Sequence, residues 1–169
     1  MDAVERSKIG FKYLFECFTS DGALKWAFTE ENLIPDAGRD YLLNSGLNAG
    51  AQLSSWFIGL YSGNYAPVAG DTAATFPANA TEITTAYTGD RHTLTPDALV
   101  GGVWVNAVAP AIFAFTDATT TVRGGFISSI ATKGGTTGLL LSAVLAPSPK
   151  TVLAGESLKV TAGLSFITA

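Results

Sequence analysis

The C-terminal end of the chain has the clearest alternation of hydrophobic and polar positions. Between residues 157 and 166, apolar side chains alternate with polar or very small ones. Successive side chains of a β-strand point to opposite faces, so this alternation predicts a half-buried strand. The residues predicted to face the core are Leu158, Val160, Ala162, Leu164 and Phe166.

Short apolar segments of this kind recur through the second half of the chain. The predicted strands are 55–61, 102–108, 112–115, 125–130, 139–145 and the terminal one. Turn-forming residues separate the last five, at 109–110, 117–121, 133–138 and 147–149. Short strands spaced about ten residues apart are typical of an antiparallel β-sandwich or jelly roll, so we expect a mainly β fold.

The N-terminal part predicts a β-hairpin followed by a short helix. Residues 9–29 contain two apolar-patterned strands joined through Asp21-Gly22, a strong hairpin signal. After Pro35, residues 36–44 predict a helix, with Asp36 as its N-cap and Gly46 as its C-terminal cap. We therefore expect an N-terminal arm over 1–52 and a β-sandwich domain over 53–169.

The hairpin has large apolar residues on both of its faces, which is unusual for a surface element. One face of the hairpin can pack on the protein's own sheet, and the other then needs a neighbouring molecule. The hairpin residues predicted to make interactions are Phe11, Tyr13, Leu14, Phe18 and Trp26.

Residues 62–93 are rich in Gly, Pro, Asn, Thr and Ala and show little periodicity. They predict a long, ordered loop that crosses one end of a sheet. Its expected anchors are Tyr65, Phe76 and Tyr87.

Composition adds the expectation of partners. Hydrophobic residues make up 47% of the chain and charged residues 14%, and the mean hydropathy is +0.30. Such a chain is expected to bury surface against other molecules, and we predict a homo-oligomer. A well-packed sandwich with a Ser/Thr-rich surface is the alternative explanation.

Other classes of protein receive no support from the sequence. The net charge of −4 does not favour nucleic-acid binding. No apolar run reaches the roughly 18 residues of a membrane helix, and residues 1–10 lack the apolar core of a signal peptide. The single cysteine, Cys17, excludes an internal disulfide and fits synthesis in a cytoplasm.

The sequence also predicts no catalytic, cofactor-binding or metal-binding residues, so we expect that the protein is not an enzyme. His92 and Cys17 belong to unrelated segments, and neither has a recognisable catalytic partner. Residues 132–138 are glycine-rich, but their lysine precedes the glycines and a strand follows, unlike a phosphate-binding loop. Arg91, near Glu82, is interpreted as part of a structural ion pair, with an intersubunit contact as the alternative.

Many short pieces of the chain together resemble one protein family. They are Asp21-Gly22, Lys25-Trp26, Asn32-Leu33-Ile34, Gly38, Trp56 to Leu60, Ala69 to Thr72, Glu82, Tyr87, Arg91, Gly125-Phe126-Ile127, Thr132 to Gly138 and Gly155 to Leu158. In this order they resemble a group of short virion proteins of tailed bacteriophages, often encoded close to the capsid genes. Glu156 stands where an aspartate is usual in that family.

The resemblance implies a structural role as a head decoration, or cement, protein. The expected partners are the major capsid protein and further copies of the chain, in a trimer. The expected location is the capsid surface of the virion, after synthesis in the host cytoplasm. Two alternatives are a tail or collar fibre component that contacts a receptor, and a carbohydrate-binding β-sandwich module.

Overall fold

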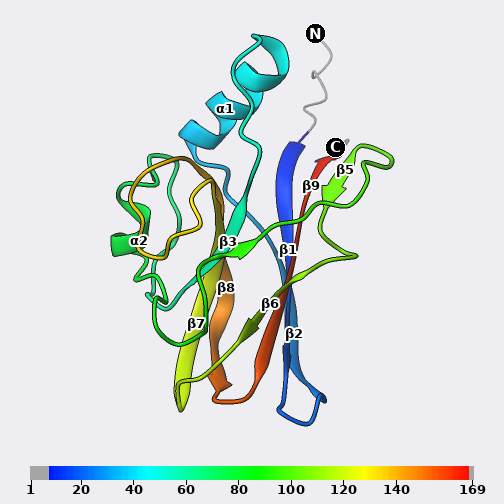
Figure 1. Ribbon diagram of the computed structural model, residues 1–169. Coiled ribbons are helices and arrows are strands. Elements are labelled where there is room, and N and C mark those ends of the chain that lie inside the picture. The colour runs from blue at the N-terminus through cyan, green and yellow to red at the C-terminus, as the bar shows by residue number, and fades with distance from the viewer. Residues whose placement is uncertain (1–7, 168–169) are drawn as a thin grey trace, which may run out of the picture.

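The computed structural model describes residues 8–167 and confirms a mainly β fold. Strands make up 45% of the chain and helices 10%, and the strands form two antiparallel sheets (Figure 1). The first sheet has the order β2-β1-β9-β5, with β6 also paired to β9, and the second has the order β4-β3-β7-β8. The two sheets pack face to face as a sandwich around a common core.

The strands of the first sheet, here called sheet A, are β1 (Lys8–Phe18), β2 (Leu24–Glu31), β5 (Val103–Val105), β6 (Ala111–Ala114) and β9 (Ser157–Ile167). Those of the second, sheet B, are β3 (Phe57–Tyr61), β4 (His92–Thr93), β7 (Thr119–Ser128) and β8 (Leu140–Leu153). The helices are α1 (Asp36–Leu47) and α2 (Phe76–Asn79).

The two longest strands of sheet A lie side by side at its centre. β1 and β9 pair antiparallel over their whole length, from Lys8 opposite Ile167 to Phe18 opposite Ser157. The inward apolar stripe of β9, recognised in the sequence, therefore continues directly into the aromatic stripe of β1. This pairing corrects the predicted division at residue 52, because the hairpin is a central part of the sandwich and not an arm attached to it.

The core lies between the two sheets. Phe11, Tyr13, Phe15 and Cys17 of β1 are all at most 1% exposed, and they face buried residues of sheet B such as Ile58. The hydroxyl group of Tyr13 donates to Ser142 Oγ on β8 at 2.7 Å, so one polar contact crosses the core. Burial of each large side chain is worth about 1.5–3 kcal/mol, which makes this stripe a major source of stability.

The long loop is held by its three predicted aromatic anchors, although the segment also contains the short helix α2 and ends in strand β4. Phe76 and Tyr87 are buried, and the half-buried Tyr65 packs edge-on against Phe76 with ring centroids 5.9 Å apart. Phe76 also packs against Phe126 of β7, in a second cluster of buried residues. The three aromatic anchors thus hold an irregular segment in one place.

The predicted hairpin turn is confirmed. Gly22 has a φ of 85°, a left-handed conformation that glycine adopts without strain. The turn closes through backbone hydrogen bonds from Thr19 N to Ala23 O and from Gly22 N to Thr19 O, both at 2.9 Å.

The limits of the helix differ from the prediction. Pro35 occupies the N-cap position, and Asp36 lies in the first turn, where it pairs with Arg39. The helix continues through Gly46 to Leu47 and ends at Asn48, whose N–H binds the carbonyl of Asn44 at 3.0 Å. Asp36 thus favours the helix through its position near the positive end of the helix dipole and not through a capping hydrogen bond.

The break predicted at residues 147–149 is wrong, because β8 runs through Pro147 and Pro149. β8 is an edge strand of sheet B. Residues 146–149 also lie in a bulge between the pairs Gly124–Leu145 and Val122–Lys150. Prolines are tolerated at edges and bulges because no ladder hydrogen bond needs their missing N–H.

A buried ion pair fastens the end of the long loop to sheet B. Arg91 donates to Glu82 through Nε and Nη2, each at 2.7 Å, and both side chains are 1% exposed. The guanidinium also reaches the carbonyls of Ile130 and Gly135, and the Gly134 N–H donates to Glu82 at 2.8 Å. The pair is therefore structural, and residues 133–135 form the turn that surrounds it.

We predict that Arg91→Met destabilises the protein by about 3–5 kcal/mol, because Glu82 would remain as an unpaired buried charge. Urea unfolding of both proteins measures the difference. Arg39→Met removes an exposed ion pair and should cost about 1 kcal/mol or less. Equal effects of the two substitutions would contradict the structural role of the buried pair.

Candidate interaction surface

The outer face of sheet A combines apolar and polar side chains on its central strands. On β1, residues alternate with the buried stripe, so Lys12, Leu14, Glu16 and Phe18 point away from the core. The cross-strand neighbours of Leu14 are Thr29 on β2 and Thr161 on β9.

The shorter strands add apolar side chains to this outer face. Val103 and Val105 lie opposite Ser165 and Gly163 of β9, and Ile112 lies opposite Lys159. Ile112 is 54% exposed and Val103 is 40% exposed, so these side chains are open to solvent. With Leu14 and Phe18, they form what we call the outer apolar face.

A shallow hollow lies beside Leu14 on this face. Its volume is about 340 Å³, and its wall includes Leu14, Val103, Val105 and Gly163. Gly163 has no side chain, and the space next to it is bounded by the Val105 methyl groups. The hollow could therefore accept an apolar side chain of a partner.

The positive and negative charges on this face balance one another. Lys159 Nζ lies 2.6 Å from Glu16 Oε2 and 5.8 Å from the centre of the Phe18 ring. Lys12 lies opposite Glu31 in the register. The face is therefore close to neutral, so apolar contact and shape determine what can bind to it.

The structure divides the five predicted interaction residues into three groups. Phe11 and Tyr13 are 1% and 0% exposed, so they belong to the core and cannot contact a partner directly. Leu14 and Phe18 lie half-buried on the outer face. Trp26 lies half-buried on the inner side of β2, and its indole N–H donates to the Thr151 carbonyl of β8 at 3.1 Å.

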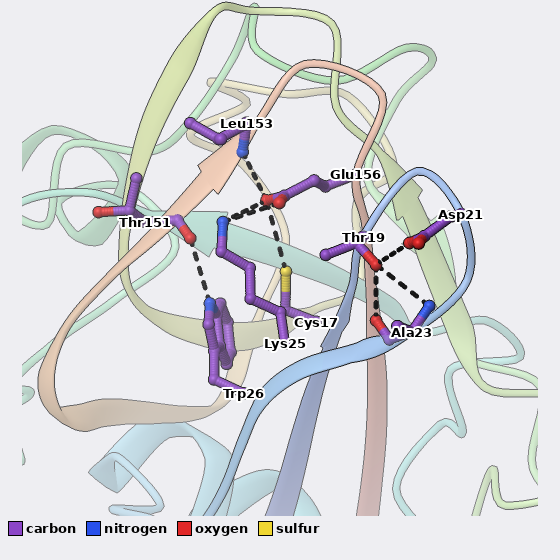
Figure 2. A network of polar contacts seen from close by, with 9 residues as sticks. All are labelled: Cys17, Thr19, Asp21, Ala23, Lys25, Trp26, Thr151, Leu153 and Glu156. Atoms are coloured by element: carbon purple, nitrogen blue, oxygen red, sulfur yellow. Dashed lines mark hydrogen bonds and ion pairs between the residues drawn. The ribbon is translucent and has the colours of Figure 1, made fainter.

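A polar network joins the hairpin to the turn between β8 and β9 (Figure 2). Lys25 Nζ lies 2.8 Å from both carboxylate oxygens of Glu156, and the Leu153 N–H donates to Glu156 Oε2 at 2.8 Å. The thiol of Cys17 approaches the same oxygen at 3.8 Å. Glu156 thus holds one end of β2 against the turn that leads into β9.

Sequence reasoning missed this network. Lys25 and Glu156 are 131 residues apart in the sequence, and neither lies in a charged cluster. The signal that could have found it is the position of Glu156 directly after Gly155 at a turn, in a half of the chain with few charges. A carboxylate kept there is expected to have a specific partner.

The two residues considered for nucleophilic chemistry lie in separate environments. Burial raises the pKa of Cys17 to about 11, and the neighbouring Glu156 charge acts in the same direction. His92 packs against Phe113 with ring centroids 4.4 Å apart, and burial followed by the Lys133 charge lowers its pKa. At neutral pH the thiol is protonated and the imidazole is neutral.

Metal ligands do not gather in the part of the chain that the structure describes. Over residues 8–167 there is no group of three or more His, Cys, Asp or Glu side chains placed to hold an ion. Within the same range, no helix is both long and apolar enough to cross a membrane.

A second pocket lies next to α1, on the inner side of sheet A. Its volume is about 310 Å³, and its lining includes Tyr41, Gln52, Trp56 and Trp104. Trp56 is only 9% exposed and meets Tyr41 edge-on, with ring centroids 5.3 Å apart. This leaves the half-buried Trp104 as the most open indole, so the pocket offers a limited platform for stacking a sugar ring.

Comparisons with known proteins do not assign the chain to a family. Neither the protein-family models, nor the curated proteins, nor the solved structures give a match.

We predict that acid weakens the protein partly through Glu156. Burial alone would raise the pKa of this carboxyl group, but the hydrogen bonds from Lys25 and Leu153 and the charge of Lys25 lower it. The folded state then binds the proton less tightly than the unfolded state. The resulting stability is present above the ordinary glutamate pKa of about 4.3 and is lost as the pH falls through the lower pKa of the folded state.

Urea unfolding between pH 3 and pH 7 provides the test. Glu156→Gln should lower stability at pH 7 and flatten the dependence on pH below about 5. An unchanged dependence on pH in this variant would contradict the prediction.

Proposed function

We propose that the protein is a structural component of a bacteriophage virion that decorates the head. It binds the major capsid protein across neighbouring capsomers and stabilises the shell against internal pressure. It acts by burying surface and not by catalysis, at the capsid surface, after synthesis in the host cytoplasm. The proposal joins the family resemblance seen in the sequence to the geometry of the outer apolar face.

One observation carries the proposal: the central strand β1 presents large apolar side chains to both sides. Its inner stripe fills the core, while Leu14 and Phe18 stand on the outer face beside the exposed Ile112. A protein that acts alone in water gains little from such a face. A protein that covers a shell gains about 1.5–3 kcal/mol for each large side chain that the contact buries fully.

Attachment through a sheet face also suits a decorating role mechanically. The β1–β9 ladder spans eleven residue pairs and backs the whole outer face, so a load applied there spreads over many hydrogen bonds. The ion pair between Lys159 and Glu16 keeps the polar part of the face ordered before contact. A rigid face loses little conformational entropy on binding.

A tail or collar fibre component is the second candidate, since the same apolar face could serve there. Copy number separates the two, because a decoration protein is present in hundreds of copies and a collar component in about a dozen or fewer. Counting the protein on purified particles, and locating it by cryo-electron microscopy, decides between them. The third candidate, a carbohydrate-binding module, would depend on the pocket beside α1.

We predict that the double variant Leu14→Ser, Phe18→Ser folds but binds heads at least tenfold more weakly. Each serine removes apolar area that the contact would bury, and together they outweigh the roughly 1.4 kcal/mol of a tenfold change. Co-sedimentation with heads assembled from the major capsid protein of the same phage measures binding, and circular dichroism measures folding.

The matched control is Leu43→Ser, Leu47→Ser, which changes two exposed apolar residues on α1, outside sheet A. It should bind as the unmodified protein does. Normal binding by a folded Leu14→Ser, Phe18→Ser variant would show that the docking surface lies elsewhere.

A further inference from the structure

The edges of the two sheets are not equally protected against pairing with another chain. The edge strand β8 is protected in two ways. Ala143 forms a β-bridge with Leu33, and Pro147 and Pro149 lack the backbone N–H groups that a further strand would need. The edge strands β4, β5 and β6 have only two, three and four residues. β2 differs from them, because it has eight residues, contains no proline and pairs only with β1 among the described residues.

The unpaired backbone groups of β2 can be identified from the register. The Asn32 N–H donates to the Phe11 carbonyl at 3.0 Å, so residue 32 faces β1. In an antiparallel ladder alternate residues face the partner strand, and the register from Lys12 opposite Glu31 is regular up to Cys17. Residues 28 and 30 therefore also face β1, while Ala27, Thr29 and Glu31 direct their N–H and C=O groups outward.

The inner side of this edge is only partly covered. Phe28 stacks on Phe15 with ring centroids 4.7 Å apart, and Trp26 stacks on Phe28 at 5.9 Å, yet both β2 rings remain half-buried. Lys150 of β8 reaches over the Phe28 ring at 5.8 Å. Neither Lys150 nor Glu30 has a salt-bridge partner among residues 8–167.

We propose that β2 pairs with β2 of a second copy of the chain, antiparallel and across a two-fold axis, with Phe28 opposite Phe28. Outward-facing residues must meet outward-facing residues, and this register pairs residues 25–31 of the two copies. Centring on Ala27 would overlap as many residues, but only the register centred on Phe28 brings the two Phe28 rings together. Ala27 then forms hydrogen-bonded pairs with Thr29 of the second copy.

The side chains of β2 are complementary to themselves in this register. The two Phe28 rings meet at the axis and bury area that the single chain leaves half exposed. Glu30 of one copy comes opposite Trp26 of the other, whose indole binds the carbonyl next to Lys150. The unpaired carboxylate thus approaches the unpaired ammonium group, and the acidic residues of the two copies lie at opposite ends of the contact.

This self-association goes beyond the proposed attachment to a capsid and uses the backbone edge of β2, although the Thr29 side chain also borders the hollow on the outer apolar face. It gives a two-fold dimer, where the family resemblance implied a trimer. The structure favours a second copy of the chain over a strand of another protein. In this register the two β2 strands overlap over most of their length, the two Phe28 rings touch, and Glu30 of each copy approaches Lys150 of the other.

Thr29→Pro tests the pairing by removing one outward N–H. The substitution leaves the ladder with β1 intact, because the N–H of residue 29 does not face β1. Thr29→Val is the matched control, since it keeps the N–H and changes the side chain. Sedimentation equilibrium should show a dimer for the unmodified chain and for Thr29→Val, and at least a tenfold weaker dimer for Thr29→Pro.

A cross-linking experiment tests the register. Residues opposite each other in a non-hydrogen-bonded pair have Cα atoms about 4.5 Å apart, within the range of a disulfide. In a Cys17→Ser background, Phe28→Cys should therefore form a disulfide-linked dimer on mild oxidation. Ala27→Cys should not, because its equivalent in the second copy is displaced along the strand.

The outcomes discriminate between the occupants. A monomer at high concentration, or a trimer that Thr29→Pro does not change, would overturn the proposal. A monomer whose binding to heads is lost in Thr29→Pro but kept in Thr29→Val would assign the edge to a capsid strand instead and would equally overturn it. If the Leu14→Ser, Phe18→Ser variant still binds heads, that result contradicts the proposed docking surface and leaves the dimer proposal unaffected.

Discussion

The full-length pairing of β1 with β9 is the constraint on which the rest of the structure depends. It joins the beginning and the end of the described chain, and it fixes which side of β1 faces the core, because a slip of one residue would reverse every side chain. β2 is then placed on one side of the pair, while β5 and β6 share the other side. The buried side chain of Asn106 fills the gap between β5 and β6, accepting the Ala162 N–H at 2.7 Å.

Buried polar groups in this protein position loops on sheets. Glu156 holds the β8–β9 turn against Lys25, and Arg91 with Glu82 holds the end of the long loop against the 133–135 turn. Taking such charges out of water is expensive, and the gain over well-packed apolar residues is small. Their benefit is directional: each ion pair forms only when its hydrogen-bonding groups are correctly oriented. The pairs therefore keep the loops from sliding along the apolar core, which offers no such directional contacts.

Local pattern was enough to predict most of the strands, the Asp21-Gly22 turn and the aromatic anchors of the long loop, because each depends on neighbouring residues. The turn predicted at 117–121 is wrong in part, because β7 already begins at Thr119. The partner of β1 could not be predicted in this way, since pairing with β9 joins residues far apart in the sequence. The same limit applies to Glu156, whose charge is visible but whose partner Lys25 is not. Pro147 and Pro149 led to the wrong prediction of a break, because the effect of a proline depends on whether its strand lies at the edge of a sheet.

For the candidate surface, the sequence identified Leu14 and Phe18 as interaction residues. It could not separate them from the core residues Phe11 and Tyr13, because alternation along a strand does not tell which face packs against the second sheet.

The two proposed surfaces are linked by the geometry of the sheet. A two-fold axis through an antiparallel pair of edge strands runs perpendicular to the sheet, so the outer faces of both copies point to the same side. A dimer through β2 would then present Leu14 and Phe18 twice on one continuous sheet. Two weak contacts held rigidly together bind far more tightly than either alone when their spacing matches the target. On a shell built from repeated subunits, a decorating protein with a modest apolar face could in this way bind firmly as a dimer and exchange readily as a monomer.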